Sequence, residues 1–174
     1  MRKLLGTLIF SSLMMSGQAM ALTCPAEGFV QDAASAFMGA ARRGSPQAFS
    51  VAAGRYADLR GLALFALGPY RRDLPANMEG KYVSLAKSFM GRFMAENSSS
   101  LSGGALAITS CSGNTISGRF SSGSSIVFRL SGNSRIEDVS VSGVSIAQAM
   151  RSKFTGIIHD HGGDINALIS YLSR

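Results

Sequence analysis

The sequence predicts an α+β domain, in which helices precede and follow a mostly antiparallel, curved sheet of four strands. Three observations lead to this prediction. Apolar residues recur at helical spacing over the first part of the chain, and they alternate with polar residues between Gly104 and Val141. The helical period then returns after Gly143 and continues to Leu172. The order of elements is therefore helices, a meander of strands, and two final helices.

Before the sheet, the apolar residues mark a series of helical segments. The first segment runs from Phe29 to Gly44, where the glycine ends it. Ser45 and Pro46 then supply a cap and a first-turn proline where a new helix can begin. A segment rich in Leu and Ala then covers residues 56–67. The last segment before the sheet is strongly amphipathic, and its apolar face holds Tyr82, Leu85, Ala86, Phe89, Phe93 and Met94.

The sheet is predicted from short runs in which apolar residues alternate with Ser, Thr, Gly and Arg. Gly113-Asn114, residues 122–124 and Gly132-Asn133 separate these runs as turns. The last strand holds Val139 and Val141, and Ile136 is out of phase with them, which indicates a bulge or a late strand start. The alternating apolar residues of the first three strands are Leu106, Ile108, Ile116, Phe120, Ile126, Phe128 and Leu130.

Two amphipathic helices are expected after the sheet. Ser145 is well placed to cap the first helix, and Gly162-Gly163 ends it. Asp164 can cap the last helix. The apolar faces of the two helices hold Ile146, Met150, Phe154 and Ile157, and then Ile165, Leu168, Ile169 and Leu172.

The N-terminus has the pattern of a secretory signal peptide. Arg2 and Lys3 are followed by an uncharged apolar stretch to Met15 and by the small-residue site Ala19-Met20-Ala21. Cleavage after Ala21 would divide the chain into a signal peptide, residues 1–21, and one mature domain, residues 22–174. No other apolar run is long enough for a membrane helix, so we expect the mature protein in the periplasm. The alternative, lipidation at Cys24, lacks the small residue expected directly before the cysteine.

The charge balance is basic, with 17 Lys and Arg against 10 Asp and Glu. The mature chain loses Arg2 and Lys3, which leaves 15 basic residues. This balance favours anionic surfaces, and export makes nucleic acid an unexpected partner. Six arginines of the helical half could meet a phosphate or an acidic partner, or could be exposed residues balanced by Asp58 and Asp73. They are Arg42, Arg43, Arg55, Arg60, Arg71 and Arg72.

Cys24 and Cys111 are the two cysteines of the chain. In an oxidising compartment such a pair usually forms one disulfide, which would fix the mature N-terminus to the sheet. In the chain-entropy model a loop of this length contributes about 4 kcal/mol. The spacing fits no C-x-x-C redox or zinc pattern, and the alternative is two buried free thiols.

The closing segment from Asp138 to Leu172 resembles a known family. Its order is D-V-x-V-x-G-V-S-I, then R-S-x-F, then G-x-I-x-x-L-I-x-x-L, and the run from Ala63 to Arg72, A-L-F-A-L-G-P-Y-R-R, adds a second match. Both are similar to segments of MlaC, the toluene-tolerance family of periplasmic phospholipid-binding proteins. The chain departs from the family at Arg135-Ile136, where an aromatic residue is usual.

The resemblance implies that a helical layer and the sheet enclose an apolar pocket for the acyl chains of a phospholipid. Matching the family's wall positions to this chain gives eight lipid-binding candidates: Leu64, Leu67, Tyr70, Phe89, Phe93, Phe128, Val139 and Val141. The implied partners are phospholipid, an inner-membrane ABC-transporter complex with its lipid-binding substrate protein, and an outer-membrane lipoprotein complex. The alternatives are a carrier of another hydrophobe, such as a hopanoid, and a non-catalytic adaptor of a membrane transport complex.

Enzymatic functions find little support in the sequence. His159, His161 and Asp164 are the best candidates for a metal or catalytic site, but they fall at a helix end, where neighbouring side chains point in different directions. Helix capping is the simpler interpretation of the two histidines. Gly143-Val144-Ser145 lacks the second glycine of a nucleophile elbow. Because no nucleotide-binding loop is present either, the sequence predicts no catalytic residue, metal or cofactor.

Overall fold

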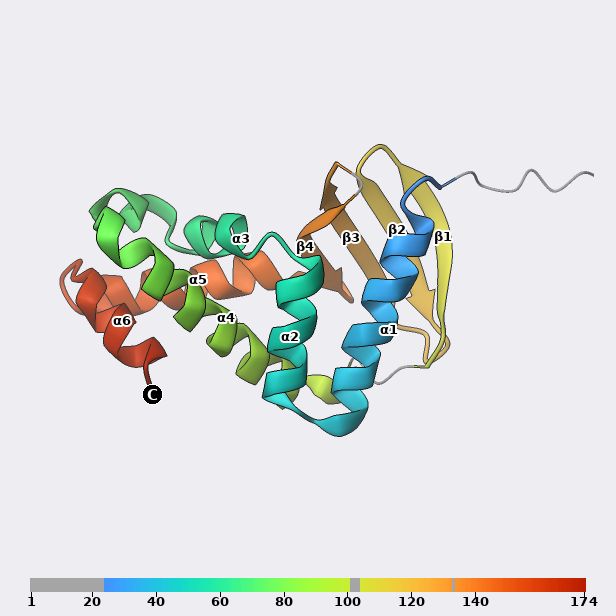
Figure 1. Cartoon of the computed structure of the whole chain (residues 1–174), viewed down its shortest axis with the longest axis horizontal. Coiled ribbons are helices and arrows are strands. Elements are labelled where there is room, and N and C mark those ends of the chain that lie inside the picture. Colours follow the sequence, from blue (N-terminus) through green and yellow to red (C-terminus); the bar gives the residue numbers. More distant parts are fainter. Residues whose placement is uncertain (1–23, 101–103, 133) are drawn as a thin grey trace, which may run out of the picture.

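A computed structural model of the chain describes residues 24–100, 104–132 and 134–174. The predicted leader, residues 1–21, lies outside this part. The molecule is elongated, with the sheet and helix α1 (Glu27–Arg43) at one end and helices α5 (Ile146–Asp160) and α6 (Ile165–Leu172) extending to the other (Figure 1). Within the described ranges, no helix is both long and apolar enough to span a bilayer.

Helices α1 and α2 (Pro46–Tyr56) form as the sequence predicts. Gly44 ends α1 with a φ of 56°, a left-handed conformation that glycine adopts easily. The hydroxyl of Ser45 then accepts a hydrogen bond from the backbone N–H of Ala48 at 3.2 Å, and Pro46 occupies the first turn of α2. These local signals are enough to set the boundary between the two helices.

The segment after α2 differs from the prediction of one Leu- and Ala-rich unit over residues 56–67. Helix α2 ends at Tyr56, Ala57 forms a bridge with Ile136 of the sheet, and Asp58 caps helix α3 (Leu59–Ala66). The backbone N–H of Asp58 also donates to the carbonyl of Ile136 at 2.9 Å. The helical chain breaks here because these backbone groups are paired with the sheet.

Three short helices and one long helix complete the first half. The 3-10 helices η1 (Gly68–Asp73) and η2 (Ala76–Met78) lead into α4 (Glu79–Glu96), and η3 (Ser98–Ser100) follows it. Helix α4 passes along α2 and reaches α3 and α6 (Figure 1). Its buried Tyr82 donates its hydroxyl hydrogen to the carbonyl of Ala63 at 2.6 Å, which joins α4 to α3.

The sheet is antiparallel, and its strands lie side by side in chain order. The strands are β1 (Leu106–Ser112), β2 (Thr115–Phe120), β3 (Ser125–Ser131), β4 (Arg135–Val141) and β5 (Val144–Ser145). The two-residue β5 makes five strands where the sequence predicts four. The predicted bulge is confirmed, because Arg129 pairs with Asp138 and Leu130 with Ile136, which leaves Glu137 as the extra residue.

The final helices begin and end where the sequence predicts. Ser145 accepts a hydrogen bond from the N–H of Gln148 at 3.1 Å and caps α5, and Asp164 caps α6 through the N–H of Asn166. Their apolar faces pack against α4, where Phe154 meets Phe89 edge to face at 5.1 Å. This packing makes the helical end of the molecule a filled core.

The sheet contacts the helices mainly at its edges. At one edge β1 contacts α1, and at the other edge β5 and its neighbour β4 contact α5, while β4 also contacts α3. A disulfide between Cys24 and Cys111 adds a covalent link between the start of α1 and β1, with the two Cα atoms 5.8 Å apart. The predicted pairing of the cysteines is thus present, and the central strands span the space between two fixed edges.

Candidate functional site

The helix-facing side of the sheet is apolar because the strand register places apolar residues opposite one another. Ile116 lies opposite Phe128, and Phe128 lies opposite Val139, which gives a row across three strands. Gly118, Ile126 and Val141 form the next row. Residues opposite each other in adjacent strands point to the same face, so both rows face α1 and α4.

A cavity of about 50 Å³ lies between this face and the helices. Helices α1 and α4, the segment around α3, three strands and the start of α5 contribute to its wall. The lining residues are Ala34, Phe37, Met38, Ala57, Leu62, Met90, Met94, Phe120, Ile126, Phe128, Ile136, Asp138, Val139 and Ile146.

The cavity is apolar but small. A dry cavity of about 150 Å³ lined by apolar side chains holds one benzene molecule, so about 50 Å³ is too little for an alkyl chain. The free space between the sheet and the helices is therefore too small, in this structure, for an acyl chain. A large apolar ligand enters only if the side chains of the wall, or the layers themselves, move apart.

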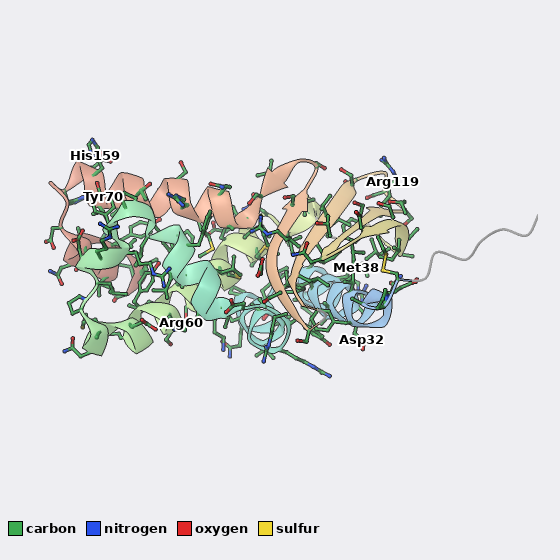
Figure 2. The ribbon with its side chains drawn as sticks, turned by 90° about the horizontal axis from the view of Figure 1, so that it is seen from above. Asp32, Met38, Arg60, Tyr70, Arg119 and His159 are labelled. Atoms are coloured by element: carbon green, nitrogen blue, oxygen red, sulfur yellow. A yellow bond between two sulfur atoms is a disulfide. The ribbon has the colours of Figure 1, made fainter. Side chains whose placement is uncertain are left out.

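Three methionines make part of this wall adaptable. Met38 comes from α1, and Met90 and Met94 lie one turn apart on α4. Their side chains are unbranched and polarisable, so they can change rotamer and fill an irregular space. In Figure 2 Met38 lies at the sheet end of the molecule. The wall that faces the strands can thus change shape without unfolding a helix.

Asp138 is the charged side chain in this wall, and it is only 8% exposed. One carboxylate oxygen accepts hydrogen bonds from the backbone N–H groups of Val139 at 2.9 Å and Ala147 at 3.0 Å. The other oxygen accepts from the hydroxyl of Ser145 at 2.6 Å. Because both oxygens are used at the N-terminus of α5, where negative charge is favoured, this carboxylate is stabilised without a cationic partner.

Two of the eight lipid-binding candidates, Phe128 and Val139, line the cavity. Val141 and Phe93 instead line a neighbouring surface pocket of about 270 Å³, which we call the outer pocket. Its lining residues are Phe93, Met94, Asn97, Val141, Ser142, Val144 and Ile146. These four candidates therefore belong to one end of the molecule, around the sheet and the last turns of α4.

The other four candidates lie in the helical end. Leu64 and Leu67 are buried in the core that α3 forms with α4 and α5. Phe89 packs on Phe93 and Phe154. Tyr70 lies in η1, at the end of the molecule far from Met38 (Figure 2). The structure does not bring these residues to the cavity.

The sequence reasoning did not include the three methionines among the wall residues. A usable signal was present, because five methionines follow Ala21 and two of them are spaced by four residues on an amphipathic helix. Met38 directly follows Phe37 in the first helix. Adaptable side chains on two helices that face one sheet are typical of a surface that accommodates ligands of variable shape.

The charged candidates do not gather into one site. The six arginines are exposed and divided between the end of α1, the end of α2 and the region of α3 and η1. Arg60 forms a forked ion pair with Glu79, at 2.6 and 3.2 Å, and Arg55 lies over the ring of Tyr56.

The interpretation of the histidines as helix-capping residues is supported for His161, because its Nδ1 lies 2.8 Å from the carbonyl oxygen of Ile157 at the end of α5. Among the residues with described positions, no three potential ligands gather as a metal ion requires.

Comparisons with known proteins identify a family and a similar fold. The family model of the MlaC protein matches residues 39–174. A solved structure of a phospholipid-binding protein from Ralstonia solanacearum, in complex with a phospholipid, is similar in fold, with a TM-score of 0.67 and 15% sequence identity. The similarity covers 85% of this chain and 94% of that one. A search of curated proteins gave no match.

Proposed function

The chain belongs to the MlaC family, and we therefore propose that it binds a phospholipid by taking acyl chains into the cavity between the sheet and helices α1 and α4. The family is one of binding and transport proteins rather than enzymes. The observation that carries the proposal is the apolar cavity with its three methionines. The phospholipid in the complex of the Ralstonia protein, which has the same fold, supports this choice of ligand.

We further propose that the protein is an exported carrier, with residues 1–21 as its signal peptide and residues 22–174 as one lipid-binding domain. The transfer free energy explains why a carrier needs partners. Each buried methylene is worth about 0.8 kcal/mol, so a tail of about 16 carbons represents on the order of 12 kcal/mol. Unaided release of such a tail into water is slow, and a docked partner must offer another apolar route.

The partners that fit this role lie in the two membranes. We propose an outer-membrane lipoprotein complex on one side and an inner-membrane ABC-transporter complex with its lipid-binding substrate protein on the other. The basic balance of the mature chain supports contact with anionic or acidic surfaces. Exposed arginines at both ends of the helical half provide candidate contacts, including Arg42, Arg43, Arg71 and Arg72.

Native mass spectrometry of the exported protein tests the proposal. We expect a species heavier than the polypeptide by the mass of one phospholipid, and organic extraction should release and identify that lipid. A hopanoid or another hydrophobe in the extract would change the ligand but keep the carrier function. A protein that is empty on purification and takes no lipid from phosphatidylglycerol vesicles would contradict the proposal.

A pair of variants tests the position of the lipid. Ala34→Leu places a larger side chain in the cavity from α1, so it should reduce the fraction of lipid-loaded protein. Val51→Leu adds apolar volume at an exposed position of α2 and is the matched control. Equal loading of the two folded variants would mean that the acyl chains lie elsewhere.

A further inference from the structure

The cavity and the outer pocket have two side chains in common. Met94 and Ile146 line both of them, whereas Met90 lines the cavity alone. The outer pocket reaches the surface, where Val144 is 63% exposed and lies at its rim. A movement of one side chain in this shared partition would therefore join the cavity to an apolar depression that already meets solvent.

Ile146 is the fixed side of this partition. It is the first residue of α5, and the residues on either side of it are held by Asp138. The carboxylate of Asp138 accepts from the hydroxyl of Ser145 at 2.6 Å and from the N–H of Ala147 at 3.0 Å. The side chain of Ile146 is also β-branched, so its χ1 angle has few alternatives. Displacing it would require breaking the cap of α5.

Met94 is the adjustable side of the partition. It lies in the last turn of α4, which ends at Glu96, and its side chain is buried. Three rotatable bonds allow the thioether to leave the partition while the helix backbone stays in place. The vacated position would connect Phe93 and Val141 of the outer pocket with Met90 of the cavity.

We propose that Met94 is the movable wall through which a phospholipid acyl chain passes between the outer pocket and the cavity. The inference rests on the proposed function, and it assigns the mouth of the site to the space between the end of α4 and the β4–β5 turn. The outer pocket then holds the part of the lipid nearest the head group. Phe93 and Val141, which do not line the cavity, take part in binding as its walls.

A competing route exists on the other side of the cavity. Phe37 and Met38 of α1 line the cavity and are half-buried, so the chain could instead enter between α1 and the sheet. The Met94 route opens directly into the outer pocket, which shares Met94 and Ile146 with the cavity. Continuity of apolar surface favours Met94, because the acyl chain then stays out of water along the whole path.

Stopped-flow uptake of a pyrene-labelled phosphatidylglycerol from vesicles by the delipidated mature protein tests the proposal. Met94→Ala removes the partition and should raise the uptake rate about two- to tenfold, the factor that corresponds to an ordinary rotamer change. Met94→Leu keeps the volume with a stiffer side chain and should slow uptake. Met90→Ala enlarges only the cavity, so it should raise the amount bound more than the rate. Met78→Ala, in η2 and outside the linings of both pockets, is the control.

The outcomes separate this inference from the proposed function. Rate changes at Met94 that exceed those at Met90 and Met38 support the inference, and the slow Met94→Leu variant does so even if Met94→Ala fails to fold. Uptake that responds equally at Met90 and Met94, or chiefly to Met38→Ala, would overturn it while the carrier function stands. A wild-type protein that takes up no lipid would overturn both.

Discussion

At the scale of single residues, Tyr82 shows how burial and one hydrogen bond join two helices. Its ring is fully buried, and its hydroxyl donates to the carbonyl of Ala63 at 2.6 Å. The Tyr82→Phe variant leaves this carbonyl without its partner, and the net contribution of such a bond is about 1 kcal/mol. We expect the free energy of unfolding in urea at neutral pH to fall by this amount. An unchanged value would mean that the carbonyl finds another donor.

The same side chain makes stability depend on high pH. Burial raises the pKa of Tyr82, so the folded protein keeps the phenol neutral where the unfolded chain begins to ionise. The contribution to stability is complete below about pH 10, the ordinary tyrosine value, and is lost as the pH rises further. Its slope reaches about 1.4 kcal/mol per pH unit. Denaturation curves between neutral pH and pH 11 should show a shallower loss for Tyr82→Phe than for the wild type.

At the scale of elements, helix α4 approaches α2 closely because Gly91 has no side chain. A Cβ atom at this position would overlap the hydroxyl of Ser50 and the backbone carbonyl of Pro46. Gly91→Ala should therefore force the helices apart and destabilise the protein by about 1–3 kcal/mol. Urea denaturation with circular dichroism detection measures the change.

Gly156 in α5 is the matched control for this prediction. A Cβ atom there meets no other atom within 4 Å, so alanine adds helix propensity without a clash. Gly156→Ala should stabilise the protein by about 0.5–1 kcal/mol, opposite in sign to Gly91→Ala. A Gly91→Ala variant at least as stable as the wild type would mean that the close approach of α2 and α4 does not limit stability.

Element boundaries were predictable because their causes are local in the chain. Ser45, Ser145 and Asp164 cap the helices that follow them, and the phase of Ile136 indicated the bulge in β4. The break at Ala57 was not predicted, because it depends on pairing with Ile136, about 80 residues away in the chain. Long-range pairing of this kind leaves no periodic signal in the sequence.

That break explains why Leu64 and Leu67, two of the eight lipid-binding candidates, lie away from the cavity. Helix α3 starts only after the contact with the sheet, and it packs on α4 and α5. Leu64 and Leu67 consequently fill the helical core, although their spacing resembles that of cavity residues such as Leu62. Apolar periodicity identifies which residues are buried, but the packing of elements decides whether they meet a neighbour or a void.

At the scale of the whole molecule, the disulfide joins the segment before α1 to the first strand of the sheet. Cys24 and Cys111 are 87 residues apart in sequence, so the bond constrains a large part of the unfolded chain. In the chain-entropy model its loss costs about 4–5 kcal/mol. Thermal unfolding with and without reductant should show a clear decrease in Tm. Cys111→Ser should match the reduced protein, and an equal Tm in both states would contradict the prediction.

The small volume of the cavity predicts which parts of the molecule change when it takes up lipid. Five methionines follow Ala21, and three of them, Met38, Met90 and Met94, line the cavity. Met150 is buried outside its wall, and Met78 lies in η2. These positions provide probes and internal controls within one sample of methyl-labelled protein.

We expect the methyl resonances of the three cavity methionines to shift when lipid is added, while those of Met78 and Met150 remain in place. The physical reason is that about 50 Å³ cannot hold an acyl chain, so the adaptable wall must rearrange around it while the filled helical core does not. Shifts of similar size at Met150 would mean that loading rearranges the helical core as well. Shifts absent from all three cavity positions would place the bound lipid outside the space between the sheet and the helices.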